Sequence, residues 1–175
     1  MAGETRAWHE ITRDVLRARN VSLIPYVPDN VLRPLIAPLE ADPFFTVFTC
    51  TREQEAVGIA CGAWMAGRHA MVLMQTSGFA TLPNVLASLP VPFQIPALMM
   101  VSERGTLGEF NIGQTMVART MRPVLDSLAL EHHTLSRLDE VEFILDRAIR
   151  QAVATAQPVT FILNPLLTGG KVFKD

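Results

Sequence analysis

Glu53 is the residue whose type and position best suit acid–base chemistry. It follows the apolar run 44–50 and stands at the start of a helical pattern over 51–67. A carboxylate in the first turn of a helix also favours the helix dipole by about 0.3–1 kcal/mol, so a purely structural role is open. Glu55 competes with it, but two residues along a helix rotate the side chain by about 200°. Only one of these two carboxylates can therefore face a given crevice.

Polar residues follow three of the other apolar runs. They are Asp29-Asn30, Thr76-Ser77-Gly78 and, in or next to the polar segment 103–113, Arg104, Asn111 and Gln114. Hydroxyl, amide and backbone N–H groups can bind a cofactor or a substrate, but the same residue types form turns and cap helices. Arg104 could pair with an anion or could lie in solvent as a loop charge.

The elements that must position these residues alternate from end to end of the chain. Helical patterns predict helices at 4–19, 30–41, 51–67, 79–89, 114–127 and 138–156. Apolar runs predict strands at 21–27, 44–50, 69–75, 95–102 and 158–164, and the segment 131–135 is expected to be a further short strand. This alternation is typical of a three-layer α/β/α fold with a mainly parallel sheet, in which ligands bind beyond the carboxyl ends of the strands.

Local signals refine the ends of these elements. Thr51 is expected to cap its helix in a capping box with Gln54, and Gly67 to end that helix. Pro34 and Pro38 are expected to bend or break the second helix. The segment 76–78 is expected to be a tight loop. The expected core includes Leu35, Val47, Ile59, Val72, Leu86, Leu98, Ile144 and Ile162.

Composition and charge exclude several classes of function. The length of 175 residues suits one domain. The net charge is −2 and no basic stripe is present, so nucleic-acid binding is not expected. The most apolar stretch, 85–101, contains three prolines and is shorter than the ~20 apolar residues of a membrane-spanning helix. With its polar N-terminus, the chain is expected to be cytoplasmic and not membrane-bound. Cys50 and Cys61 do not make a disulfide framework or a zinc-ligand pattern.

The helix that begins near Glu53 resembles the catalytic-glutamate helix of thiamine diphosphate enzymes. Small residues follow Glu53 at Ala56 and Ala60, and Gly62 stands nine residues after it. Further segments match in order: Val27–Leu32, Thr51–Ala60, Gln75–Gly78 with Asn84 and Leu89, Ile95–Leu98, Arg104-Gly105, Gly108-Glu109 and Gln114. This ordered set, which covers about the whole chain, is similar to the thiamine diphosphate-dependent decarboxylases. The resemblance is closest to the sulfopyruvate decarboxylase alpha subunits and to the matching part of the phosphonopyruvate decarboxylases.

The resemblance implies a fold, an activity and a set of site residues. Residues 1–175 would form a single pyrimidine-binding domain that serves the decarboxylation of a small anionic 2-oxoacid. Glu53 would be the catalytic residue, hydrogen-bonded to N1′ of the aminopyrimidine. The other cofactor-binding residues would be Thr76, Ser77 and Gly78. The substrate-binding residues would be Asp29, Asn30, Arg104, Asn111 and Gln114. The resemblance assigns no metal ligand to this chain.

A missing motif points to a partner subunit. Members of the family bind the diphosphate and Mg²⁺ through Gly-Asp-Gly followed further along by Asn, and no Gly-Asp-Gly occurs in this chain. The resemblance therefore implies an alpha-type subunit whose beta-type partner carries that motif and holds Mg²⁺. The cofactor would lie across their interface, in an α₂β₂ or larger assembly.

Some residues depart from the family pattern and leave alternatives open. Glu103 stands where the family often has an aromatic residue or His, and Glu109 is interpreted as a loop charge. His132-His133 lies in a late strand rather than where some members have a His pair, which favours a structural role. The alternatives are another 2-oxoacid, a carboligation reaction, or a non-catalytic α/β homologue. A nucleotide-binding module would need a phosphate cradle, and no GxGxxG or P-loop pattern is present.

Overall fold

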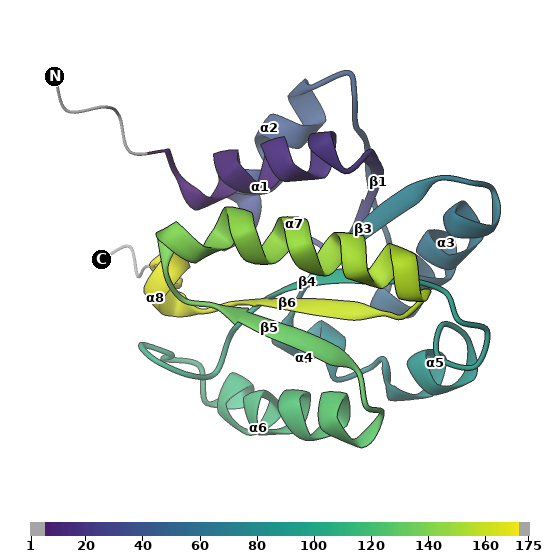
Figure 1. Ribbon diagram of the computed structural model, residues 1–175. Coiled ribbons are helices and arrows are strands. Elements are labelled where there is room, and N and C mark those ends of the chain that lie inside the picture. The colour runs from purple at the N-terminus through teal and green to yellow at the C-terminus, as the bar shows by residue number, and fades with distance from the viewer. Residues whose placement is uncertain (1–5, 172–175) are drawn as a thin grey trace, which may run out of the picture.

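The computed structural model describes residues 6–171, which form a six-stranded sheet between two layers of helices (Figure 1). All neighbouring strands are parallel, in the order β2-β1-β3-β4-β6-β5. The strands are β1 (Val21–Tyr26), β2 (Thr46–Thr49), β3 (His69–Gln75), β4 (Leu98–Ser102), β5 (Glu131–Leu135) and β6 (Val159–Leu163). The predicted three-layer fold with a parallel sheet is confirmed.

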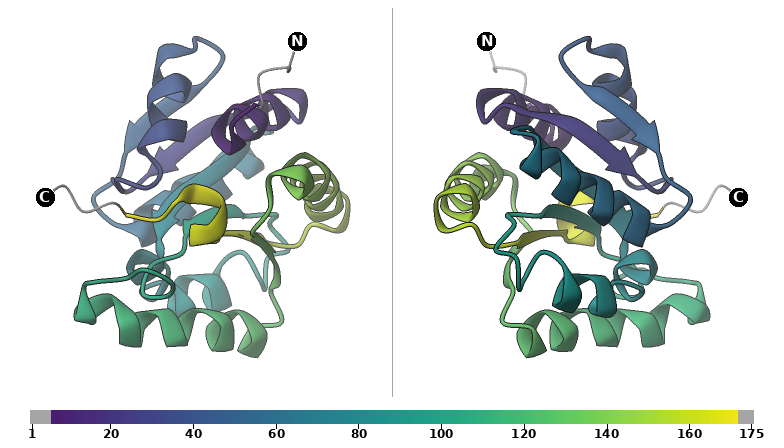
Figure 2. Two further views of the ribbon diagram at one scale, coloured as in Figure 1. Left: turned by 90° about the vertical axis from the view of Figure 1, so that its left-hand side faces the viewer. Right: turned by 90° about the vertical axis from the view of Figure 1, so that its right-hand side faces the viewer.

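The helices divide between the two faces of the sheet. One face is covered by α1 (Trp8–Ala18), α2 (Arg33–Ala41) and α7 (Leu138–Thr155). The other is covered by α3 (Glu53–Met65), α4 (Thr76–Phe79), α5 (Pro83–Ser88) and α6 (Ile112–Ser127). A short helix, α8 (Pro165–Thr168), follows β6. Figure 2 shows α7 and the green helix α6 on opposite sides of the sheet.

Each central strand supplies side chains to both layers of the core. In β3, Met71 and Leu73 pack with α1, α2 and α7, whereas Val72 and Met74 pack with the helices of the opposite face. Successive side chains of a strand point to opposite faces, so a strand buried on both sides must be apolar at every position. This explains why the strands read as continuous apolar runs.

Two expectations about burial are wrong in part. The run 44–50 was expected to be a buried strand, but β2 has only four residues and is partly exposed. It lies at the edge of the sheet and pairs only with β1. Among the expected core residues, Val47, Ile59 and Ile144 are only partly buried and pack against the core from outside. The buried ones are Leu35, Val72, Leu86, Leu98 and Ile162.

Several expected element ends also differ. The N-cap of α3 is Arg52 rather than Thr51, and no capping box with Gln54 forms. The N–H of Thr51 instead donates to the Glu55 carboxylate at 2.8 Å. Gly67 takes the left-handed φ of +77° one residue past the C-cap, as a helix end requires.

The proline and loop expectations are corrected as well. α2 runs unbroken, since Pro34 lies in its first turn and Pro38 is accommodated inside it. The segment 76–78, expected to be a tight loop, belongs to the single helical turn α4. The first helix was expected from residue 4, but residues 4 and 5 lie outside the described part, and α1 begins at Trp8. Across residues 6–171, no helix combines the length and apolarity needed to cross a membrane.

Candidate active site

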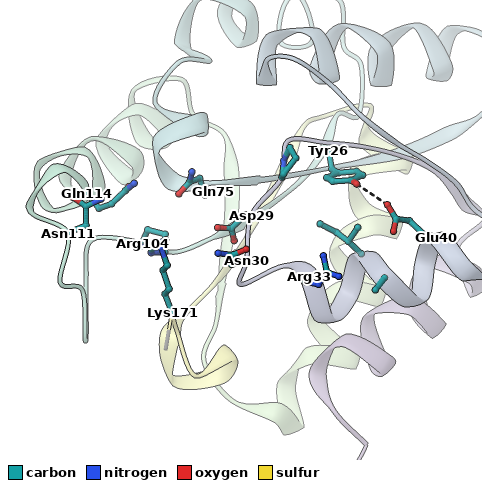
Figure 3. Close-up of a pocket in the computed structure, with 13 residues that line it drawn as sticks. Tyr26, Asp29, Asn30, Arg33, Glu40, Gln75, Arg104, Asn111, Gln114 and Lys171 are labelled. Carbon is teal, nitrogen blue, oxygen red and sulfur yellow. Dashed lines mark hydrogen bonds between the residues drawn. The ribbon is translucent and has the colours of Figure 1, made fainter. Parts of the chain in front are cut away.

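A polar cleft of about 400 Å³ opens at the carboxyl ends of β1, β3 and β4. All five residues expected to contact a substrate line it: Asp29, Asn30, Arg104, Asn111 and Gln114 (Figure 3). The parallel sheet brings them together because the loops after its strands share one edge. Sequence patterns did not point to five other polar residues of the lining: Tyr26, Arg33, Glu40, Gln75 and Lys171.

Asp29 organises the turn between β1 and α2. Its Oδ2 accepts hydrogen bonds from the N–H groups of Val31 and Leu32 at 3.1 and 3.3 Å. The same oxygen accepts the Ser102 hydroxyl at 2.8 Å, which ties the end of β4 to this turn. Asp29 was expected to cap a helix, but the N-cap of α2 is Leu32 and no side chain caps that helix. Asp29 instead stabilises the turn that precedes α2, and it also borders the cleft.

Arg104 is buried and ion-paired, not a solvated loop charge. Its Nε and Nη2 donate to the Glu109 carboxylate at 2.8 and 2.9 Å, and the two side chains are only 7% and 4% exposed. The hydrogen bond from Arg104, with further donation from the N–H groups of Asn111 and Gly105, lowers the pKa of Glu109 to about 2. The interpretation of Glu109 as a free loop charge is also wrong. This pair leaves the Arg104 guanidinium largely neutralised.

Glu103 likewise holds the scaffold together. Its buried carboxylate accepts hydrogen bonds from Arg122 of α6 and from the Asn164 amide, the latter at 2.7 Å. Arg122 also donates to the Thr134 hydroxyl at 3.1 Å. These contacts join the carboxyl ends of β4, β5 and β6 to α6. His132 and His133 lie in β5 and do not line the cleft.

Glu53 is the first residue of α3, and its carboxylate lies against the backbone of Gly78. A Cβ built on Gly78 would stand 2.1 Å from the Glu53 Oε1, so only glycine allows this approach. Within residues 6–171, no group donates a hydrogen bond to the half-buried Glu53 carboxylate. Glu55 is exposed and already accepts the N–H of Thr51. Of the two acids, Glu53 is therefore the one available to a ligand.

The end of β3 and the turn α4 connect Glu53 to the cleft. Gln75, the last residue of β3, lines the cleft, and Gly78, three residues later, contacts Glu53. Thr76 between them is buried, donating its hydroxyl to the Ser102 carbonyl at 3.2 Å and accepting the Arg104 N–H at 2.9 Å. Ser77 is half-buried on the same turn. Glu53, Thr76, Ser77 and Gly78 do not themselves line the cleft, and Gln75 is the residue that joins the two places along the chain.

Solved structures identify the class of fold. The chain superposes on a thiamine diphosphate-dependent 4-hydroxybenzoylformate decarboxylase from Rhodococcus jostii RHA1 with a TM-score of 0.68 and 16% identity, covering 97% of this chain. A 2-oxoglutarate:ferredoxin oxidoreductase from Magnetococcus marinus gives a TM-score of 0.70 at 11% identity over 93% of this chain. The chain spans 34% of the decarboxylase chain and 29% of the oxidoreductase chain, so this fold matches about a third of each.

Sequence relatives identify the family. The chain is 36% identical to the sulfopyruvate decarboxylase subunit alpha of Methanothermobacter thermautotrophicus over 79% of this chain and 84% of the relative. It is 31% identical to the sulfopyruvate decarboxylase subunit alpha of Methanocaldococcus jannaschii over 87% of this chain and 90% of the relative. A Streptomyces viridochromogenes phosphonopyruvate decarboxylase is 37% identical over 54% of this chain and 24% of the relative. No family model matches. The chain belongs to the family of sulfopyruvate decarboxylase alpha subunits.

The Glu109 pKa makes part of the stability pH-dependent. Because the folded pKa of about 2 lies below the ordinary 4.5, ionised Glu109 stabilises the fold fully above about pH 4.5, and this contribution is lost as the pH falls towards 2. Glu109→Gln should cost about 3–5 kcal/mol at pH 7, because buried Arg104 loses its partner.

Urea unfolding at pH 7 and at pH 3 measures this effect. The difference in unfolding free energy between wild type and Glu109→Gln should shrink at pH 3. Asp139→Asn removes an acid from the exposed Arg137–Asp139 pair and serves as the control, because water screens that pair and its loss should change the unfolding free energy little. If the difference in unfolding free energy between wild type and Glu109→Gln is equally large at both pH values, that result contradicts the burial argument.

Proposed function

We propose that this chain is the pyrimidine-binding alpha subunit of a thiamine diphosphate-dependent 2-oxoacid decarboxylase. Its substrate would be a small anionic 2-oxoacid such as sulfopyruvate or phosphonopyruvate, the compounds named in its relatives. One observation carries the proposal: an unpaired Glu53 carboxylate lies against Gly78, three residues after Gln75, which lines the polar cleft. Membership of the alpha-subunit family supports the same reading.

The residues around Glu53 fit the aminopyrimidine end of the cofactor. The Glu53 carboxylate occupies the place where a Cβ on Gly78 would stand, and among residues 6–171 no group donates a hydrogen bond to it. The Glu53 carboxyl would hydrogen-bond to N1′ and share one proton with it, while Thr76, Ser77 and Gly78 would border the ring. When bound, thiamine diphosphate supplies the electron sink for loss of CO₂. The residues of α3 and α4 supply orientation and the proton at N1′.

The cleft residues would bind and orient the substrate. Asn111 accepts the Gly113 N–H through its Oδ1 at 3.0 Å, which leaves its NH₂ group free to donate. Asn30 and Gln114 add amides that can donate to carboxylate oxygens. Asp29 and Arg104 would act mainly by fixing the cleft walls, since Asp29 holds the turn after β1 and Arg104 is paired with Glu109.

A partner subunit would complete the site. The relatives are named alpha subunits, which implies a second kind of subunit. We propose that a beta-type chain with a Gly-Asp-Gly…Asn motif binds the diphosphate and Mg²⁺, and that the pair self-associates into an α₂β₂ or larger complex. The cytoplasmic location remains a prediction of the sequence.

Glu53→Gln tests the catalytic assignment. Loss of the carboxylate should lower kcat at least about 100-fold, because the proton at N1′ can no longer be shared with an acid of the right strength. The measurement is steady-state decarboxylation of sulfopyruvate by the chain co-purified with its beta-type partner. Glu55→Gln is the matched control and should retain activity within a few-fold. Unimpaired turnover by Glu53→Gln would remove Glu53 from the mechanism.

Gly78→Ala tests the close contact itself. The added Cβ overlaps the Glu53 carboxylate and should push that side chain aside, while the flexible carboxylate keeps the cost to folding small. We expect an unfolding temperature within a few degrees of wild type but thiamine diphosphate binding weakened at least about 10-fold. Gly62→Ala is the control because nothing lies within 4 Å of its added Cβ. Equal cofactor affinity in both variants would contradict the assignment.

Reconstitution tests the need for a partner. The chain alone should show no decarboxylation of sulfopyruvate or phosphonopyruvate with thiamine diphosphate and Mg²⁺. The mixture with a beta-type chain should turn over at least one of them. Activity of the chain alone would refute the split-subunit proposal.

A further inference from the structure

The cleft has two chemically different ends (Figure 3). At one end, Glu40 accepts the Tyr26 hydroxyl at 2.9 Å, and Arg33 lies on the same helix, α2. At the other end lie Lys171 and Arg104 with the amides of Asn111 and Gln114. The first end therefore carries an acid and a cation on one helix, while the second presents two cations and two amides.

Lys171 is the available cation at this second end. Arg104 gives two of its donors to Glu109, whose negative charge cancels that of the guanidinium. Among residues 6–171, no carboxylate lies within ion-pairing distance of Lys171, whose Nζ stands 5.6 Å from the centre of the Phe110 ring. Because the Arg104–Glu109 pair is neutralised, the Lys171 ammonium is the group at this end that attracts the negative charge of a ligand most strongly.

The local sequence explains why Lys171 reaches the cleft. Asn164 caps α8 by accepting the Leu166 N–H at 3.0 Å. Gly169 and Gly170 then take φ angles of +79° and +66°. Two consecutive left-handed residues favour glycine, because a Cβ would strain the backbone there. The chain thereby turns back after α8, and Lys171 lies over the loop between β4 and α6.

The amides beside Lys171 match an anion with several oxygens. The Gln114 Oε1 is buried and has no hydrogen-bond partner within the described residues. The NH₂ group of the same amide is unpaired within the described residues and can donate to a ligand in the cleft that Gln114 lines. Asn111 has its NH₂ group free because its oxygen accepts the Gly113 N–H. One ammonium and two amides can therefore donate to the separate oxygens of a tetrahedral anion.

We propose that Lys171 binds the terminal anionic group, sulfonate or phosphonate, of a doubly charged 2-oxoacid and so determines specificity against singly charged 2-oxoacids. This assignment rests on the proposed decarboxylase function. Asn111 and Gln114 hold the remaining oxygens of that group, and the substrate carboxylate and 2-oxo group point away from Lys171. Lys171 acts on binding and takes no part in proton transfer.

The test is a comparison of KM and kcat for Lys171→Met in the complex with the beta-type partner. KM for sulfopyruvate should rise roughly 10–100-fold, the effect of losing one charge-assisted hydrogen bond, while kcat changes less than about three-fold. Phosphonopyruvate tests whether the same residue serves either anion. Pyruvate lacks the second anion, so its inhibition constant should change less than about two-fold. Lys171→Arg should recover most of the affinity.

A distant cation provides the matched control. Arg150→Met removes a charge from a half-exposed side chain of α7 outside the cleft and should leave KM unchanged. The Lys171 assignment is wrong if the KM of Lys171→Met for sulfopyruvate stays at the wild-type value. It is also wrong if the inhibition constant of pyruvate rises by the same factor as that KM. In both cases the decarboxylase function stands. If the wild-type complex decarboxylates neither anionic substrate, the proposed function itself fails and the Lys171 assignment fails with it.

Discussion

The Glu109 carboxylate is the interaction on which the geometry of the cleft depends. It accepts two hydrogen bonds from the Arg104 side chain and three from the N–H groups of Gly105, Phe110 and Asn111. One buried anion therefore shapes the whole connection from β4 to α6. The positions of Asn111, at the start of α6, and of the Phe110 ring beneath Lys171 follow from it. Such a fixed wall suits a binding site, because the loop loses little conformational entropy when a ligand binds.

The same pairing explains a division of labour among the cations. A buried arginine must be paired, since an isolated charge away from water costs several kcal/mol or more. Arg104 is therefore suited to support the wall and poorly suited to attract a substrate. A ligand-binding cation works better at the rim, where water solvates it until the ligand arrives. Lys171 is exposed and meets that condition. The cleft thus separates structural charge from charge that is free to bind.

The sequence was sufficient for the fold and for part of the cleft. A continuous apolar run located β3, and the alternation with helices located the polar strand β5, both at their observed bounds. The rule for parallel sheets brought Asp29, Arg104 and Gln114 to one edge. The hydrogen-bond and ion-pair partners of individual side chains were harder to predict, because the Arg104–Glu109 pair depends on how a loop folds back on itself. Lys171 was missed for the same reason: its place depends on two left-handed glycines, whose φ angles no periodic pattern encodes.

The two acids at the start of α3 illustrate how position divides similar residues between roles. Glu55 accepts the N–H of Thr51 and so satisfies a backbone donor at the start of the helix. That leaves Glu53 without a structural task, against a glycine that admits its carboxylate. A half-buried acid with no partner is destabilising unless something else gains from it. The chain therefore carries a carboxylate that the proposed cofactor would pair with, in a site that a second subunit would complete.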